Sequence, residues 1–213
     1  MSSAHPSNPL ALAVLALLFE RPMHPYEMAA TMKERAKHES IKLRYGSLYT
    51  VIDGLIARGF IAAKEKEREG ARPERTVYRL TPAGRAELIA WMRDLIGTPA
   101  KEYPQFEAGL CLLPVLPPDE ALALLRERLQ RLDDMIKPLA AHQRSIGPQF
   151  PALFLVENDY RLAMLKAEQR FVADLVGKIE KGWGPLGLWR AFHEDRKATL
   201  EKIYREFGGG PAE

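Results

Sequence analysis

The stretch GSLYTVIDGLIARG, residues 46–59, has the clearest periodic pattern of the chain. Its apolar residues recur at i, i+3, i+4, i+7 and i+8, which predicts a helix with one apolar face formed by Leu48, Val51, Ile52, Leu55 and Ile56. Gly59 follows at the place where a left-handed C-terminal cap belongs. The opposite face carries hydroxyl groups, an aromatic ring and few charges: Ser47, Tyr49, Thr50, Asp53 and Gly54. An ordinary surface helix carries Lys and Glu there, so this composition predicts a face used for contact.

Two helices are predicted before this stretch. Asn8-Pro9 combines an N-cap residue with a proline at the first helical position, and helical spacing of apolar residues begins at Leu10. A second helix is expected to follow His24-Pro25-Tyr26 and to continue to about Ala36.

A hairpin and a fourth helix are predicted after it. Residues 60–63 and 76–80 are short apolar or alternating segments on either side of a charged stretch that contains Gly and Pro, which is typical of a β-hairpin. Thr81-Pro82 then opens a helix whose expected apolar face is Leu88, Ile89, Met92, Leu95 and Ile96. Three helices, a two-stranded wing and a closing helix together predict a winged helix-turn-helix.

The second half has no strand pattern and is predicted to be all-helical. The expected domain boundary is Gly97, which gives domains over residues 1–97 and 98–213. A helix opening at Pro117-Pro118 carries apolar residues in the 3–4 spacing of a coiled-coil seam, and Pro138 is expected to end or kink it. Another long helix, about 152–181, is expected to have the apolar face Tyr160, Met164, Ala167, Phe171, Leu175 and Ile179, and a last helix is expected over about 186–207.

Composition and charge narrow the function classes. The chain is 46% hydrophobic and 28% charged, as ordinary globular domains are. Its longest apolar run, Leu10 to Phe19, is short of the about 20 residues that cross a bilayer, so no membrane association and a cytoplasmic location are expected. Residues 1–97 hold 15 Lys/Arg and 11 Asp/Glu, a net +4, and residues 98–213 hold 16 and 17, a net −1. The basic excess predicts an anionic partner for the N-terminal module.

Enzyme classes find little support in the sequence. The five histidines show no metal-ligand spacing, and one cysteine excludes both an intrachain disulfide and a multi-thiolate zinc site. No glycine-rich phosphate loop is present. The chain is therefore expected to be no enzyme and to hold no metal or cofactor, and Cys111 is expected to be a small buried apolar residue.

Five sequence blocks resemble one known family. They are LALL (15–18), MHPYEM (23–28), GSLY (46–49), LIARGFI (55–61) and VYRLTPAG (77–84), and in this order the chain resembles the PadR-type transcriptional regulators over about its first 95 residues. Pro25 stands where glycine is commoner in that family, and Thr50 stands where proline is common. The resemblance implies a DNA-binding regulator, more often a repressor, whose variable helical C-terminal part dimerises; this chain looks like the larger subclass.

Helix-turn-helix docking would place the first turns of the third helix at the base edges of double-stranded DNA. Arg44 is predicted to bind guanine, Thr50 to offer its methyl to thymine, and Tyr49 to contact phosphate. The full set of predicted DNA-binding residues is Lys33, Lys42, Arg44, Tyr45, Ser47, Tyr49, Thr50, Arg72, Arg75 and Arg79. The alternatives are that both tyrosines pack against the second helix and that the hairpin arginines are solvated surface.

Dimerisation and an effector site are predicted for the C-terminal domain. A homodimer would match a palindromic operator, and its predicted seam is Leu122, Leu125, Leu129, Leu132 and Ile136, unless these leucines pack on the last helix of their own chain. An aromatic cluster is a candidate pocket for a small aromatic or lipophilic effector, or else plain core: Trp183, Trp189, Phe192 and His193. The alternative function is a winged-helix module for protein–protein contact without specific DNA binding.

Overall fold

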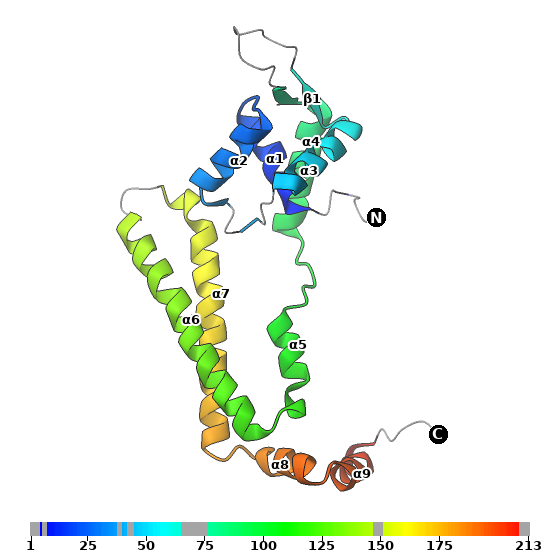
Figure 1. Cartoon of the computed structure of the whole chain (residues 1–213), viewed down its shortest axis with the longest axis vertical. Helices are drawn as coiled ribbons and strands as arrows, with labels where there is room; N and C mark the ends of the chain where they lie inside the picture. Colours follow the sequence, from blue (N-terminus) through cyan, green and yellow to red (C-terminus); the bar gives the residue numbers. More distant parts are fainter. Residues whose placement is uncertain are drawn as a thin grey trace. The chain divides into compact units, whose positions relative to one another are not determined.

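The computed structural model of the protein describes residues 5, 8–37, 40–41, 45–64, 76–146 and 151–208, with only the backbone of Tyr45 and Phe207. The chain divides into two compact units, Met1–Glu102 and Tyr103–Glu213, and each is described by itself. The first unit contains α1 (Pro9–Glu20), α2 (Pro25–Glu34), α3 (Tyr45–Ala57), β1 (Ile61–Ala63), β2 (Tyr78–Leu80) and α4 (Pro82–Gly97) (Figure 1).

Local capping signals set the starts of three of these helices. The Asn8 side chain accepts a hydrogen bond from the Leu10 amide at 3.0 Å, and the Thr81 hydroxyl accepts one from the Gly84 amide at 3.0 Å, each with a proline at the first helical position. Both predicted N-caps are confirmed. His24 caps α2 in the same way through Nδ1, which accepts from the Tyr26 amide. Gly59 ends α3 with the expected left-handed conformation, φ +71°.

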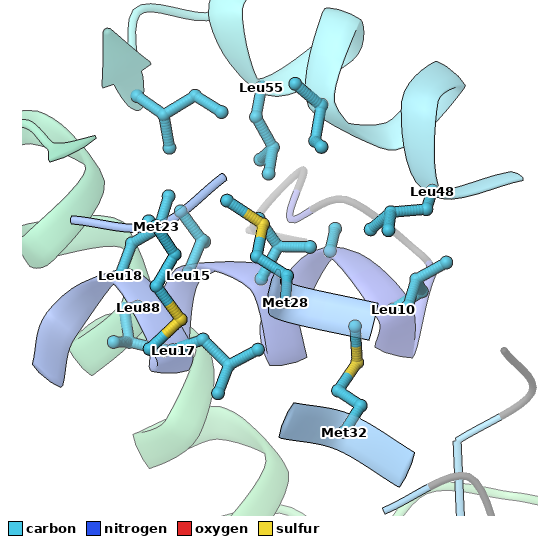
Figure 2. Packing of buried hydrophobic residues seen from close by; sticks show 14 of the residues in the cluster. Leu10, Leu15, Leu17, Leu18, Met23, Met28, Met32, Leu48, Leu55 and Leu88 are labelled. Atoms are coloured by element: carbon cyan, nitrogen blue, oxygen red, sulfur yellow. The ribbon is translucent and has the colours of Figure 1, made fainter. Parts of the chain in front are cut away.

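Leucine and methionine side chains from all four helices form the core of the first unit. Figure 2 shows them converging on α1 from α2, α3 and α4. The buried residues of α3 are Leu48, Ile52 and Leu55, as the periodicity predicts, and Val51 is half-buried. Ile56 was also expected on this face but is 39% exposed, because it lies at the edge of the stripe. The outer face of α3 is thereby held away from the core.

The predicted wing is confirmed in its two strands. β1 and β2 pair antiparallel with Ile61 opposite Leu80, while residues 65–75 between them lie outside the described part. Two mutual backbone hydrogen bonds of 3.0 Å join Met23, in the α1–α2 connection, to Tyr78 of β2. The Thr81 hydroxyl also lies 2.7 Å from the Gly59 carbonyl oxygen. The base of the wing is thus fastened both to the helix-turn-helix and to the end of α3.

The predicted apolar face of α4 is mostly wrong. Of its five residues only Leu88 is buried, whereas Ile89, Met92, Leu95 and Ile96 are exposed. The buried residues are Gly84, Leu88 and Trp91, because Gly84 lies directly against the backbone of Phe60: a Cβ there would meet the Phe60 carbonyl oxygen at 2.0 Å. This close approach sets the rotation of the helix and turns Trp91 inward, where the His5 ring stacks on it.

The second unit is helical throughout its described residues. It contains α5 (Gln105–Cys111), a 3-10 turn (Leu113–Val115), α6 (Pro118–Ile146), a second 3-10 turn (Ala152–Phe154), α7 (Val156–Glu180), α8 (Leu186–Glu194) and α9 (Arg196–Phe207). The two long helices α6 and α7 lie side by side (Figure 1). Their shared core consists chiefly of Leu125, Leu132 and Ile136 from α6 and Val172, Val176 and Ile179 from α7.

Four expectations for this unit need correction. Pro138 was expected to end or kink α6, and the first of these alternatives is wrong, because the helix continues to Ile146. Contacts with α7 occur on both sides of the proline, where Ile136 packs in the shared core and Gln143 donates to Asp159. The predicted apolar face of α7 is wrong in its N-terminal part, where Tyr160, Met164 and Phe171 are 68%, 54% and 50% exposed and Ala167 is exposed too. Its C-terminal part is right, because Leu175 and Ile179 pack in the core shared with α6.

The last predicted helix is two helices, α8 and α9. They are separated at Asp195, whose carboxylate caps α9 by accepting from the Ala198 amide. Cys111 is exposed rather than buried, because α5 covers α6 with Phe106 and not with its C-terminal end. Within the described residues, no helix has both the length and the apolar character needed to span a bilayer.

Candidate nucleic-acid interface

The outer face of α3 is the main feature of the candidate interface. Tyr49 is 52% exposed, and Thr50, Asp53 and Gly54 are exposed as well. The alternative that Tyr49 is a packing residue against α2 does not fit this exposure. A helix fixed by three fully buried apolar side chains thus presents a phenol, a hydroxyl, a carboxylate and a bare backbone to solvent.

The first turns of α3 border a shallow hollow of about 510 Å³, open to solvent. It is lined by Asn8, Gly46, Ser47, Thr50 and Val51, so the N-terminal ends of α1 and α3 meet around it. The Thr50 hydroxyl donates to the Gly46 carbonyl oxygen at 3.2 Å. Thr50 therefore satisfies its own donor inside the helix while its side chain remains exposed, and it does not disturb the first turn in the absence of the proline that the family commonly has there.

The predicted DNA-binding residues divide into described and undescribed sets. Lys33 is exposed in the last turn of α2, and Arg79 is exposed on β2. Ser47, Tyr49 and Thr50 lie together on the first turns of α3, and the backbone of Tyr45 begins that helix. Four residues of the prediction lie outside the described residues: Lys42, Arg44, Arg72 and Arg75.

Two other arginines near α2 are engaged with carboxylates. Arg35 forms a two-pronged ion pair with Glu20 at 2.5 and 2.9 Å, and the hydrogen bond from this guanidinium lowers the pKa of the Glu20 carboxyl from its usual 4.5. Arg21 pairs with Glu27 at 2.6 Å and lowers the pKa of that carboxyl in the same way. These pairs join α1 to α2 and brace the start of α2, so they serve the fold of the unit.

The predicted dimer seam lies inside one chain. Leu125, Leu132 and Ile136 are buried against α7, and Leu122 and Leu129 are half-buried in the same cluster. Their main partner is therefore α7 of the same chain, and Trp189 of α8, in the segment predicted as the last helix, belongs to the same cluster. These side chains are already covered before a second chain is considered.

The predicted effector cluster fastens α8 to the segment before α6. Trp189 is buried and its indole N–H donates to the Leu116 carbonyl oxygen at 2.8 Å, and His193 Nε2 lies 2.9 Å from the Pro114 carbonyl oxygen. The Phe192 ring meets the edge of the His193 ring, and Trp183 is 37% exposed. Trp189 is thus a core residue, whereas Phe192 and His193 are half-buried and Trp183 is exposed.

A hollow that the sequence did not indicate lies between α5 and α6. It has a volume of about 420 Å³ and is lined mainly by Phe106, Leu110, Leu113, Leu116, Leu124 and Leu125. The guanidinium of Arg128 covers the Phe106 ring at 3.6 Å and bonds Glu168 of α7. The i, i+4 and i+7 spacing of Phe106, Leu110 and Leu113 is the one signal that could have located its wall.

Throughout the described part of the chain, no group of three or more His, Cys, Asp or Glu side chains is placed to hold a metal ion.

Comparisons with known proteins agree with this architecture. Residues 14–90 match the model of the transcriptional regulator PadR-like family. No curated protein matches the chain by sequence. Among solved structures, Bacillus subtilis PadR in complex with operator DNA is 20% identical, with a TM-score of 0.63 over 82% of this chain and 99% of that one.

Two further solved structures share the fold. Bacillus subtilis PadR in complex with p-coumaric acid is 19% identical, with a TM-score of 0.64 over 80% of this chain and 98% of that one. A PadR-like regulator from Bacillus cereus is 16% identical, with a TM-score of 0.54 over 81% and 98%. The matched segment spans the helix-turn-helix, both strands of the wing and the first half of α4, and residues 14–90 of this chain accordingly form a domain of the PadR-like family of transcriptional regulators.

Proposed function

We propose that the protein is a transcriptional regulator that binds double-stranded DNA, with α3 in the major groove and the wing beside the phosphate backbone. The observation that carries this proposal is the outer face of α3, which is exposed, polar and rigidly supported by Leu48, Ile52 and Leu55. Such a regulator would act in the cytoplasm, without enzymatic activity of its own.

The contacts are assigned by position. Ser47, Tyr49 and Thr50 would face base edges and the adjacent backbone, with Arg44 and Tyr45 at the start of the helix. Lysine and arginine outside α3 would neutralise phosphates: Lys33, Lys42, Arg72, Arg75 and Arg79. Each such contact releases condensed counterions and steepens the salt dependence of binding.

We further propose that the active form is a homodimer on a palindromic operator and that it represses transcription by occupying the promoter. A second chain has to use surfaces that are still exposed in one chain. The apolar stripe of α7, Tyr160, Met164 and Phe171, is such a surface and supports dimerisation through the second unit.

An effector that releases the DNA completes the proposal. The p-coumaric acid complex concerns the Bacillus subtilis protein, and for this chain we propose a small aromatic or lipophilic effector bound in the second unit. The hollow between α5 and α6 offers space and an apolar wall, whereas two residues of the aromatic cluster, Trp189 and His193, are already engaged with backbone carbonyl oxygens of their own chain.

Fluorescence anisotropy tests the DNA proposal directly. The protein is titrated against DNA from upstream of its own gene and against an unrelated duplex, at three salt concentrations. Preferential binding to the first duplex is expected, with a log–log salt slope of about −0.9 for each neutralised phosphate. Arg79→Ala should make this slope shallower, and Arg205→Ala, at an exposed position of α9, should not. Absence of binding at low salt would contradict the proposal and favour a protein-contact module.

A further inference from the structure

Asp53 is the one charged residue in the sequence of α3, and it lies on the exposed face of the helix, one turn after Tyr49. It forms no hydrogen bond or ion pair with any residue that the structure describes. A carboxylate on a surface that meets DNA repels every phosphate near it and therefore weakens binding to all sequences alike. At such a surface, a carboxylate favours binding only where it accepts a hydrogen bond from a donor group on the DNA.

The fold of the chain does not require a glycine at position 54, the next residue of α3. A Cβ at this position would meet nothing within 4 Å, and its backbone is ordinary right-handed helix. Glycine destabilises a helix interior relative to alanine, so neither packing nor backbone conformation favours it at this position. Gly46, Thr50 and Gly54 follow one another at i, i+4 and i+8, which makes one side of α3 a row of small residues.

Close approach of α3 to the floor of the major groove would account for both the carboxylate of Asp53 and the row of small residues beside it. Aspartate has a short side chain, so its carboxylate reaches a base edge in the major groove only when the helix backbone approaches closely, and a neighbouring row of small residues permits that approach. Among the base edges of the major groove, cytosine presents the N4 amino donor, with which Asp and Glu pair. Adenine presents its amino group beside the N7 acceptor, which repels a carboxylate.

Resting on the DNA-binding function proposed above, we infer that Asp53 selects a cytosine in each operator half-site by accepting a hydrogen bond from its N4 amino group, with the row of small residues around Gly54 against the same base pairs. One helical turn rises about 5.4 Å and one base-pair step about 3.4 Å. The selected cytosine therefore lies one or two base pairs from the pair nearest to Tyr49.

The test begins with selection of binding sites from a random duplex pool by the wild-type protein. Anisotropy titrations then compare the selected duplex with versions in which each C·G pair in turn is replaced by T·A, which exchanges the amino donor for a carbonyl acceptor. For the wild type, one replacement per half-site should lower affinity about ten- to hundredfold, the range for a good base contact. For Asp53→Ala, which removes the accepting oxygens, the same replacement should change affinity less than about threefold.

The matched control is Asp94→Asn, which removes the same charge from an exposed position of α4 and should keep the wild-type base preferences. Thermal melting and circular dichroism check that the variants fold, as expected for exposed positions. If Asp53→Ala keeps the full cytosine preference, or if the wild type selects sites without it, the inference is wrong while the DNA-binding function stands. If the wild type selects no sequence at all, the DNA-binding function fails and the inference with it.

Discussion

Gly54 and Gly84 are both glycines within helices of the first unit, yet their surroundings are opposite. A Cβ at Gly54 would enter open space, and a Cβ at Gly84 would lie 2.0 Å from the Phe60 carbonyl oxygen. The chain's own packing therefore requires glycine at the second position and not at the first. Two substitutions by alanine follow from this contrast.

Gly54→Ala should raise the free energy of unfolding by up to about 1 kcal/mol, because alanine is the better helix former and nothing obstructs its methyl group. The same change should weaken binding to operator DNA, because the methyl group projects from the face proposed to meet the bases. Urea unfolding and anisotropy titration measure the two effects. Gly177→Ala in α7 is the control: it also adds a methyl group in open space, so it should leave DNA binding unchanged. If the Gly54→Ala protein binds operator DNA as tightly as the wild type, the α3 backbone does not approach the bases closely at this position.

Gly84→Ala should lower the free energy of unfolding by about 1–3 kcal/mol or more, because either α4 or the turn after α3 has to move to admit the methyl group. Urea unfolding of the two proteins at equal concentration gives the difference. Ala86→Gly is a useful companion, since it exchanges the same two residue types at an exposed position of the same helix and should cost about 1 kcal/mol. Equal stability of Gly84→Ala and wild type would contradict the packing described for α4.

The ends of several helices are determined by single capping residues. Asn8-Pro9, Thr81-Pro82 and Gly59 act through hydrogen bonds or dihedral angles within a few residues, so their roles could be predicted from sequence alone. The lack of a hydrogen-bond or ion-pair partner for Asp53 could not be predicted from sequence, because it depends on which residues the folded chain brings near this side chain. Helical periodicity predicted that Asp53 lies on the contact face, but it did not indicate a role for this residue.

At the scale of elements, the ion pair between Glu20 at the end of α1 and Arg35 after α2 gives a pH-dependent contribution to stability. Arg35 lowers the folded-state pKa of Glu20 below 4.5, so the pair stabilises the fold above that pH and loses this effect as the pH falls through the folded-state pKa. Both side chains are nearly half exposed, which limits the contribution to about 1 kcal/mol or less.

Glu20→Gln should therefore lower the free energy of unfolding slightly at pH 7, and the difference from wild type should shrink as the pH falls below 4.5 and be lost below the lowered folded-state pKa of Glu20. Urea unfolding at several pH values measures it. Glu201→Gln in α9 removes an exposed carboxylate outside these ion pairs and should show a smaller difference at pH 7. A Glu20→Gln effect that persists undiminished at low pH would show that the pair is not its source.

Helix faces were harder to predict than helix positions. The apolar faces expected for α4 and α7 were only partly right: Leu88 of α4 and Leu175 and Ile179 of α7 pack in the cores, but most of the other expected residues are exposed. Both helices carry apolar residues on more than one side, and the packing partner decides which side is buried. In α4 the decision comes from Gly84 against Phe60, and in α7 from Val172 and Val176 against α6. Pro138 lies within α6 although proline is a local helix breaker, and α6 contacts α7 on both sides of it, through Ile136 and Gln143.

For the whole molecule, the stripe on α7 leads to a prediction about assembly. The double variant Met164→Lys/Phe171→Lys should shift the protein from dimer to monomer in sedimentation equilibrium, because two charges would be buried at the proposed contact. Its helical circular dichroism should be unchanged, since both side chains are about half exposed in one chain.

Gln130→Lys, at an exposed position of α6, adds a charge away from that stripe and should leave the dimer intact. A wild type that sediments as a monomer at all concentrations would refute the dimer, and an unaffected double variant would refute only this contact surface.

The two backbone hydrogen bonds between Met23 and Tyr78 have a consequence for how the molecule opens. Each strand of the wing has three residues, too few for a hairpin to persist in water without support. The wing therefore depends on the α1–α2 connection, and that connection is held by the core that also supports α3. Opening of the wing and loosening of the helices should be one cooperative event, so the amide protons of Met23 and Tyr78 should exchange with solvent at a common, slow rate.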